Sequence, residues 1–170
     1  MNNTNTMGNL CLSTANIEKE ENPLDNAIEK LKDIKSDNQV PYFTFNNMTF
    51  YAIPCNVYDG DTFSIIFNFN GTIMKYRCRC MGYDCAEMKP RLNVPNREKE
   101  IELAHKAKER FIELLSKHQS KLVKVDCLNF DKYGRILVNI SNMVDEKSIN
   151  DIMIKEGHGK PYNGGTKEEW

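Results

Sequence analysis

The chain has 170 residues, of which 40% are hydrophobic and 28% are charged, and its formal net charge is −1. This length suits one domain of ordinary size, and no apolar run is long enough to cross a bilayer, so we expect no stable membrane insertion. The nearly balanced charge excludes a protein that coats nucleic acid with its whole surface. Any contact with a polyanion is therefore expected in a local cleft.

The N-terminal region divides into two segments by composition. Residues 1–22 are polar, rich in asparagine and without hydrophobic period, which predicts a disordered tail. Residues 23–41 are interpreted as an amphipathic helix and linker, because Leu24, Ile28 and Leu31 recur at helical spacing among charged residues. We expect this helix to pack on the domain that follows.

The first residues also bear on localisation. They have neither the basic nor the apolar region of a secretory signal, so we expect an intracellular protein. A start at Met7 would instead create a sequence similar to an acylation signal, with Cys11 as a second lipid site and membrane association as the result. That pattern needs Ser or Thr where Leu12 stands, so we favour the first interpretation.

A β-hairpin is the clearest local signal in the chain. Apolar residues alternate over residues 63–69, and Asn70-Gly71 follows as the strongest short signal for a tight turn. Residues 72–83 form the predicted return strand. Gly82 near its end predicts a bend that re-aims the residues beyond it.

The remaining elements complete a small barrel. In chain order they are a long helix, two strands and a last helix that ends near Gly157: residues 96–117, 122–127, 136–140 and 148–156. This order is compatible with a five-stranded Greek-key barrel capped by helices, an α+β fold with a mainly β core. The predicted domain spans residues 42–165, and residues 166–170 form a C-terminal tail.

The cysteines are expected to be reduced. There are six of them: Cys11, Cys55, Cys78, Cys80, Cys85 and Cys127. Without a secretory signal, small buried thiols are the expected state rather than disulfides. An alternative is a zinc or redox site on Cys78, Cys80 and Cys85, although this group lacks a second Cys-x-x-Cys pair.

Five ionisable residues in the middle of the chain carry the functional signal. Asp61 lies in Asp-Gly-Asp-Thr, Arg79 follows, Asp84 and Glu87 lie in Asp-Cys-Ala-Glu, and Arg135 ends Asp-Lys-Tyr-Gly-Arg. Two carboxylates can hold a hard cation through oxygen, guanidinium groups grip phosphate oxygens in pairs, and a further glutamate can handle a proton. Together, in this order, they indicate a metal-assisted phosphodiester hydrolase.

Four motifs in this order resemble the staphylococcal nuclease (thermonuclease) family. They are Tyr-Asp-Gly-Asp-Thr at residues 58–62, Arg-Cys-Met-Gly-Tyr-Asp-Cys-Ala-Glu at 79–87, Asp-Lys-Tyr-Gly-Arg at 131–135 and Gly-His-Gly-Lys-Pro-Tyr-Asn-Gly-Gly at 157–165. The resemblance implies an OB-fold, a five-stranded barrel with about three helices. It also implies Ca²⁺-dependent hydrolysis of DNA and RNA with low sequence specificity, leaving 5′-hydroxyl and 3′-phosphate ends.

The same resemblance implies roles for eight residues. The calcium ligands are Asp61, Asp84 and the backbone carbonyl of Cys85; the catalytic groups are Arg79, Arg135 and Glu87, the last as general base; the nucleotide contacts are Tyr133 and Tyr162. We expect a monomer that prefers accessible single-stranded DNA or RNA, because bases can stack on the tyrosines. No cofactor nucleotide is implied.

One motif departs from the family's usual Asp-Thr-Pro-Glu, since residues 84–87 read Asp-Cys-Ala-Glu. A backbone carbonyl survives this change, but a proline at a compatible site typically contributes about 0.4–1 kcal/mol of stability. We therefore expect a looser loop and modestly weaker calcium binding. The rival to an active nuclease is a non-catalytic OB-fold module that binds nucleic acid or a protein; we favour the nuclease because none of the five ionisable residues is lost.

Overall fold

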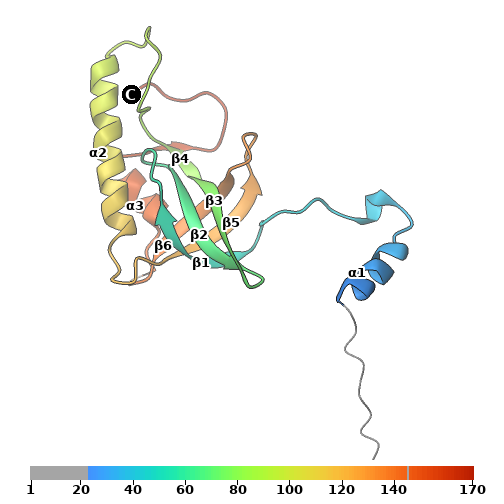
Figure 1. Ribbon diagram of the computed structural model, residues 1–170. Helices are drawn as coiled ribbons and strands as arrows, with labels where there is room; N and C mark the ends of the chain where they lie inside the picture. Colours follow the sequence, from blue (N-terminus) through green and yellow to red (C-terminus); the bar gives the residue numbers. More distant parts are fainter. Residues whose placement is uncertain (1–22, 145) are drawn as a thin grey trace, which may run out of the picture. The chain divides into compact units, whose positions relative to one another are not determined.

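The computed structural model describes residues 23–144 and 146–170 of the chain (Figure 1). The predicted disordered tail over residues 1–22, and with it the acylation sequence that begins at Met7, lies outside the described residues. The chain divides into two compact units, Met1–Tyr42 and Phe43–Trp170.

The first unit contains the predicted amphipathic helix. Helix α1 spans Pro23–Lys32 and is followed by a 3₁₀ turn, η1, over Asp37–Gln39. None of the residues of α1 is buried, and Leu24 and Leu31 are 65% and 66% exposed. The helix itself is as predicted, and its packing against the following domain stays a prediction.

Five strands of the second unit close into a barrel (Figure 1). They are β1 (Thr49–Cys55), β2 (Thr62–Phe69), β3 (Thr72–Cys80), β5 (Val123–Phe130) and β6 (Ile136–Asn142). Around the barrel they follow the order β1-β2-β3-β6-β5, and β5 pairs back with β1. All pairs are antiparallel except β3 with β6. This mixed barrel confirms the predicted five-stranded OB-like fold.

The hydrophobic pattern of the sequence explains the β2–β3 hairpin. Phe63, Ile65 and Phe67 are at most 2% exposed, so they line the barrel interior as period-two alternation requires. Asn70 and Gly71 have φ values of 49° and 85°. Positive φ at both central residues is the signature of the type I′ turn that the Asn-Gly pair predicts.

The return strand is shorter than predicted. Strand β3 ends at Cys80, and Gly82, with φ of 86°, begins a separate strand, β4, over Gly82–Asp84. Strand β4 pairs antiparallel with β7 (Lys160–Tyr162) outside the barrel. The expected bend at Gly82 is therefore present, and it moves the chain from one sheet to another.

Two helices pack on the barrel. Helix α2 (Arg97–Leu115) buries an apolar face that includes Ala107 and Phe111, and it runs along one side of the strands in Figure 1. Helix α3 (Ile149–Lys155) buries Ile149 and Met153. Of the helices that the structure describes, none is long and apolar enough to span a membrane.

Candidate active site

One cavity of about 870 Å³ collects all the residues that the sequence motifs singled out. It lies where the outer face of the β2–β3 hairpin meets β4, the turn before β6 and the chain after β7. The predicted residues that line it are Asp61, Arg79, Asp84, Cys85, Glu87, Tyr133, Arg135 and Tyr162. Residues far apart in sequence are thus brought to one hollow of the surface.

The start of β2 is fixed by a turn that the sequence motif encodes. The Asp59 carboxylate accepts hydrogen bonds from the backbone N–H groups of Asp61 and Thr62, at 3.0 and 2.7 Å. Asp side chains commonly stabilise turns in this way. Asp61 therefore lies directly before β2 and not on it, and the register pairs Thr62 with Arg79 of β3.

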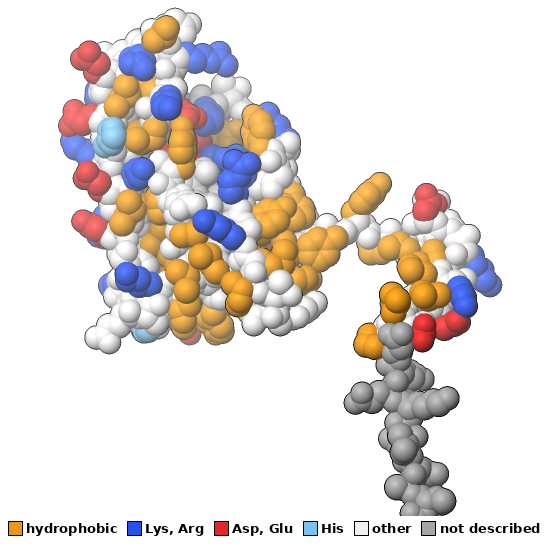
Figure 2. Space-filling model, in the orientation of Figure 1, with side chains coloured by type: hydrophobic (Ala, Val, Ile, Leu, Met, Phe, Trp, Pro, Cys, Tyr) orange, Lys and Arg blue, Asp and Glu red, His pale blue; other side chains and the backbone are white. Residues whose placement is uncertain are grey.

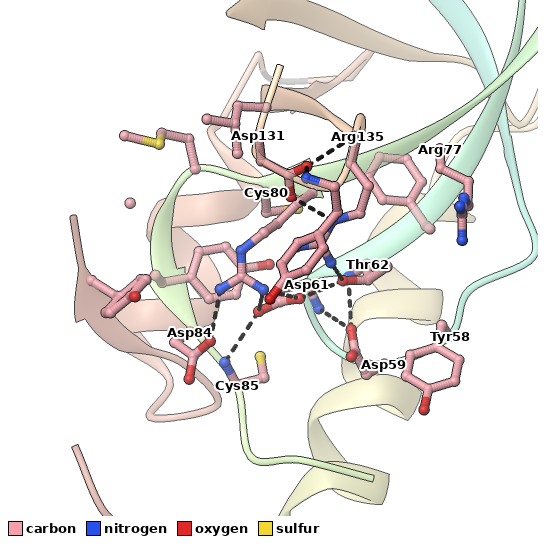
Figure 3. Close-up of a pocket in the computed structure, with 18 of the residues that line it drawn as sticks. Tyr58, Asp59, Asp61, Thr62, Arg77, Cys80, Asp84, Cys85, Asp131 and Arg135 are labelled. Atoms are coloured by element: carbon pink, nitrogen blue, oxygen red, sulfur yellow. Dashed lines mark hydrogen bonds and ion pairs between the residues drawn. The ribbon is translucent and has the colours of Figure 1, made fainter. Parts of the chain in front are cut away.

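Arg79 joins the two candidate calcium carboxylates. Its Nη1 lies 2.9 Å from Asp61 Oδ2, and its Nη2 lies 2.7 Å from Asp84 Oδ1 (Figure 3). Both aspartates are nearly fully buried, as is Asp59. Burial, and then the neighbouring Asp59 carboxylate, raise the pKa of Asp61 to about 7, although Arg79 partly opposes this. The Asp61 and Asp84 carboxylates therefore share one guanidinium, and Lys167 adds a second cation beside Asp84.

The donor set suits calcium better than zinc. Asp61 and Asp84 offer carboxylate oxygens, which a hard cation prefers. However, no group of three or more His, Cys, Asp or Glu side chains that could hold a metal ion occurs among residues 23–144 and 146–170. A calcium ion here would need the Cys85 carbonyl and waters to complete its shell. The zinc alternative finds no support, because Cys78 and Cys80 belong to the core of the barrel.

The cysteines near the site are expected to be unreactive. Burial raises the pKa values of Cys78, Cys80 and Cys85 well above that of a free thiol, and the thiolate is the reactive form. In the native protein, iodoacetamide should therefore label the half-buried Cys55 faster than these three, with all four labelled after unfolding. Peptide mass spectrometry measures this, and rapid native labelling of Cys85 would contradict it.

Arg135 is positioned by the turn that precedes β6. Asp131 accepts backbone hydrogen bonds from Tyr133 and Arg135 at 2.8 and 2.9 Å, and its second oxygen accepts from Arg135 Nε at 2.6 Å. Arg135 Nη1 lies 3.2 Å from Thr62 Oγ1, which ties the turn to β2. The guanidinium also lies 5.5 Å from the centre of the Tyr133 ring, a cation–π contact.

Glu87 and Tyr162 contact residues that follow β7. Lys167 Nζ lies 2.6 Å from Glu87 Oε1 and 2.9 Å from Asp84 Oδ1. The Tyr162 ring centre lies 6.0 Å from the Arg79 guanidinium carbon, and its hydroxyl donates to the Gly165 carbonyl at 3.0 Å. Lys167 could not be predicted as part of the site, because residues 166–170, the predicted C-terminal tail, have no pattern that indicates a return to it.

The segment that lacks the family's proline is held by other contacts. Cys85 and Ala86 are 3% and 1% exposed. The Cys85 thiol donates to the His158 carbonyl at 3.2 Å, and the Glu87 N–H donates to Glu100 Oε1 at 3.3 Å. The side chain that replaces threonine is thus part of the packing between β4 and the chain after α3.

The sequence motifs did not indicate two further residues that line the cavity, Arg77 and Tyr58. Arg77 precedes Arg79 by two positions, so both face the same side of β3, and this spacing could have revealed it. Tyr58 is 52% exposed and also lines the cavity. Figure 3 shows Tyr58 and Arg77 on the opposite side of Asp61 from Asp84. Figure 2 shows Lys and Arg side chains spread over the visible face of the second unit, with acidic side chains along the edge formed by helix α2.

Comparison with known proteins gives one family match. The model of the family described as "Staphylococcal nuclease homologue" matches residues 77–169. No curated protein matches the chain. Among solved structures, the Papi extended Tudor domain of Drosophila melanogaster is similar at 13% identity and a TM-score of 0.38, covering 82% of this chain and 86% of that one.

Proposed function

The chain belongs to the staphylococcal nuclease homologue family, and on that premise we propose that its cavity hydrolyses the phosphodiester backbone of DNA and RNA. The proposed reaction depends on Ca²⁺, has low sequence specificity and leaves 5′-hydroxyl and 3′-phosphate ends. The observation that carries the proposal is the joining of Asp61 and Asp84 by Arg79 in the cavity that also holds Glu87 and Arg135.

The proposed roles follow from the chemistry of each group. Asp61, Asp84 and the Cys85 carbonyl would hold calcium, which when bound polarises a phosphate oxygen. The Arg79 guanidinium has five N–H donors. Its two terminal nitrogens each contact one of the carboxylates, and the remaining donors can bind phosphate. Arg135 offers a second planar fork for the charge that develops at phosphorus. Glu87, which is half-exposed, can orient or deprotonate the attacking water.

The expected substrate is a flexible single strand. Tyr133 is 67% exposed and Tyr162 lies beside Arg79, so bases can stack next to the groups that bind phosphate. Stacking accepts every base, which agrees with low sequence specificity. We propose that the protein acts on such strands as a monomer.

The alternative is a non-catalytic module of the same fold that binds nucleic acid or a protein. It is favoured by one observation: Asp84 is paired with Arg79 and Lys167, and Glu87 with Lys167. Carboxylates neutralised permanently by protein cations would bind no metal. The two functions differ in whether the backbone is cut.

A cleavage assay tests the proposal. The purified chain is incubated with denatured DNA or with RNA, in calcium or in a chelator, and the products are separated on a gel. We expect cleavage in calcium and none in chelator. If calcium supports no cleavage, the nuclease proposal is wrong and the non-catalytic binding module is favoured. Asp61→Asn should abolish the calcium-dependent activity, whereas Asp33→Asn, an exposed aspartate of the first unit, is the matched control.

Arg77 is expected to bind a phosphate of the nucleic-acid backbone beside the bond that is cut. Arg77→Ala should weaken binding of a single-stranded oligonucleotide by a few-fold and reduce the slope of log affinity against log salt by about 0.7, the value for one lost phosphate contact on a single strand. Fluorescence anisotropy in chelator measures both. Lys75→Ala is the control, because Lys75 faces outward from the same strand but does not line the cavity. Equal salt slopes for the two variants would contradict this extended site.

A further inference from the structure

The chain after β7 folds back over the candidate active site. Residues 163–170, here called the C-terminal strap, form the irregular segment that runs beside β4 to the end of the chain in Figure 1. Lys167 lines the large cavity, and Thr166, Glu168 and Trp170 line a second cavity of about 120 Å³. Asp84 belongs to both cavities. The strap therefore borders the proposed calcium ligand directly.

Lys167 of the strap contacts two of the carboxylates proposed to act in catalysis. Its ammonium lies 2.9 Å from Asp84 Oδ1 and 2.6 Å from Glu87 Oε1. A protonated amine thus neutralises one carboxylate expected to hold calcium and another expected to handle the attacking water.

The strap is anchored on both sides of Lys167. On the near side, Tyr162 donates its hydroxyl hydrogen bond to the Gly165 carbonyl. On the far side, Lys160 of β7 donates to the Glu169 carbonyl and lies 3.9 Å from Glu168 Oε2. The same amine lies 4.9 Å from the centre of the Trp170 ring. These contacts are on the surface, where each is weak, so the strap can be released as a unit.

We propose that the C-terminal strap is an autoinhibitory latch, in which Lys167 occupies Asp84 and Glu87 and must leave before a divalent cation binds. The proposal rests on the function proposed above and adds its regulation. A cation on Asp84 would share its carboxylate with the Lys167 ammonium, and like charges repel. Arg79 is fixed on a barrel strand and stays; Lys167 is on a loop and can move. Because coupling is reciprocal, cation binding opens the strap and the closed strap weakens cation binding.

Calcium affinity tests the latch without any measurement of cleavage. Isothermal titration calorimetry with Ca²⁺ is expected to show about tenfold tighter binding to Lys167→Met than to the unaltered chain, within the range typical of coupled sites. Lys155→Met is the matched control, because Lys155 is exposed and lines neither cavity. A chain that ends at Gly165 should bind as tightly as Lys167→Met, and it decides the test if the point variant does not fold.

Trp170 gives a second readout, because it is the only tryptophan of the chain. Saturating calcium should shift its fluorescence emission to longer wavelength as the ring leaves Lys160 for water, and Lys167→Met should show the shifted emission without calcium. Equal calcium affinity in the unaltered chain and both strap variants overturns the latch and leaves the proposed nuclease intact. Calcium binding to none of the proteins overturns both.

Discussion

Glu87→Gln and Arg135→Ala are each expected to lower the turnover of single-stranded DNA by at least about a hundredfold. A positioned general base is typically worth about 10²–10⁴ in rate, and loss of one group that stabilises transition-state charge costs about 10²–10³. Both side chains line the cavity of Arg79 and the two aspartates. Initial rates at saturating calcium and substrate give the turnover directly.

The controls separate chemistry from stability. Arg135 also bonds to Asp131 and Thr62, so its removal can loosen the turn before β6. Circular dichroism must show a folded Arg135→Ala protein; an unfolded one would assign the arginine a structural role instead. Arg135→Lys keeps the charge but lacks the fork, and should recover only part of the rate. Full activity of Glu87→Gln would show that another group orients or deprotonates the attacking water.

Gly60→Ala is expected to destabilise the second unit by about 1–3 kcal/mol, the usual cost of overpacking. A Cβ atom at Gly60 would lie 2.6 Å from Cys85 Sγ and 2.9 Å from Ala107 Cβ, so either the segment after β4 or helix α2 must move. The Gly60 carbonyl also accepts a hydrogen bond from the buried Tyr83 hydroxyl at 2.8 Å. Urea unfolding measures the loss of stability.

A double variant identifies the cause. Cys85→Ala removes the sulfur that the new methyl group meets first, so Gly60→Ala combined with Cys85→Ala should be more stable than the sum of the two single effects predicts. The contact with Ala107 remains, so the rescue is expected to be partial. Strict additivity would show that the methyl group is accommodated elsewhere. Calcium affinity should fall with Gly60→Ala because Asp61 adjoins Gly60.

The barrel could be predicted from the sequence because its signals are local. Alternating apolar residues over 63–69 and the Asn70-Gly71 turn each act within a few residues. The pairing of β4 with β7 could not, since each strand has only three residues and they are far apart in the chain. Short segments of this kind carry no period of their own.

The candidate site shows the same division. The order and chemistry of the motifs were enough to name five ionisable residues that line one cavity, and the resemblance to the nuclease family added Cys85, Tyr133 and Tyr162. The sequence alone could not predict that Arg79 bonds to both aspartates. This contact depends on how far the bend at Gly82 turns Asp84 back toward β3. Lys167 was missed for a related reason. Its place is set by contacts of the strap with β7, which no local pattern in the tail predicts.

The parallel register of β3 and β6 protects the alignment of the arginines. Cys78 and Cys80 face the core while Arg79 faces the cavity, and Cys78 pairs with Ile136, the neighbour of Arg135. A slip of β3 by one residue would turn the arginine into the core and the thiols to the surface, and an unpaired charge in the core is costly. Misaligned but folded molecules should therefore be scarce. Substitutions that weaken the barrel far from the cavity are therefore expected to lower the fraction of folded, active molecules. The turnover of each folded molecule should stay unchanged.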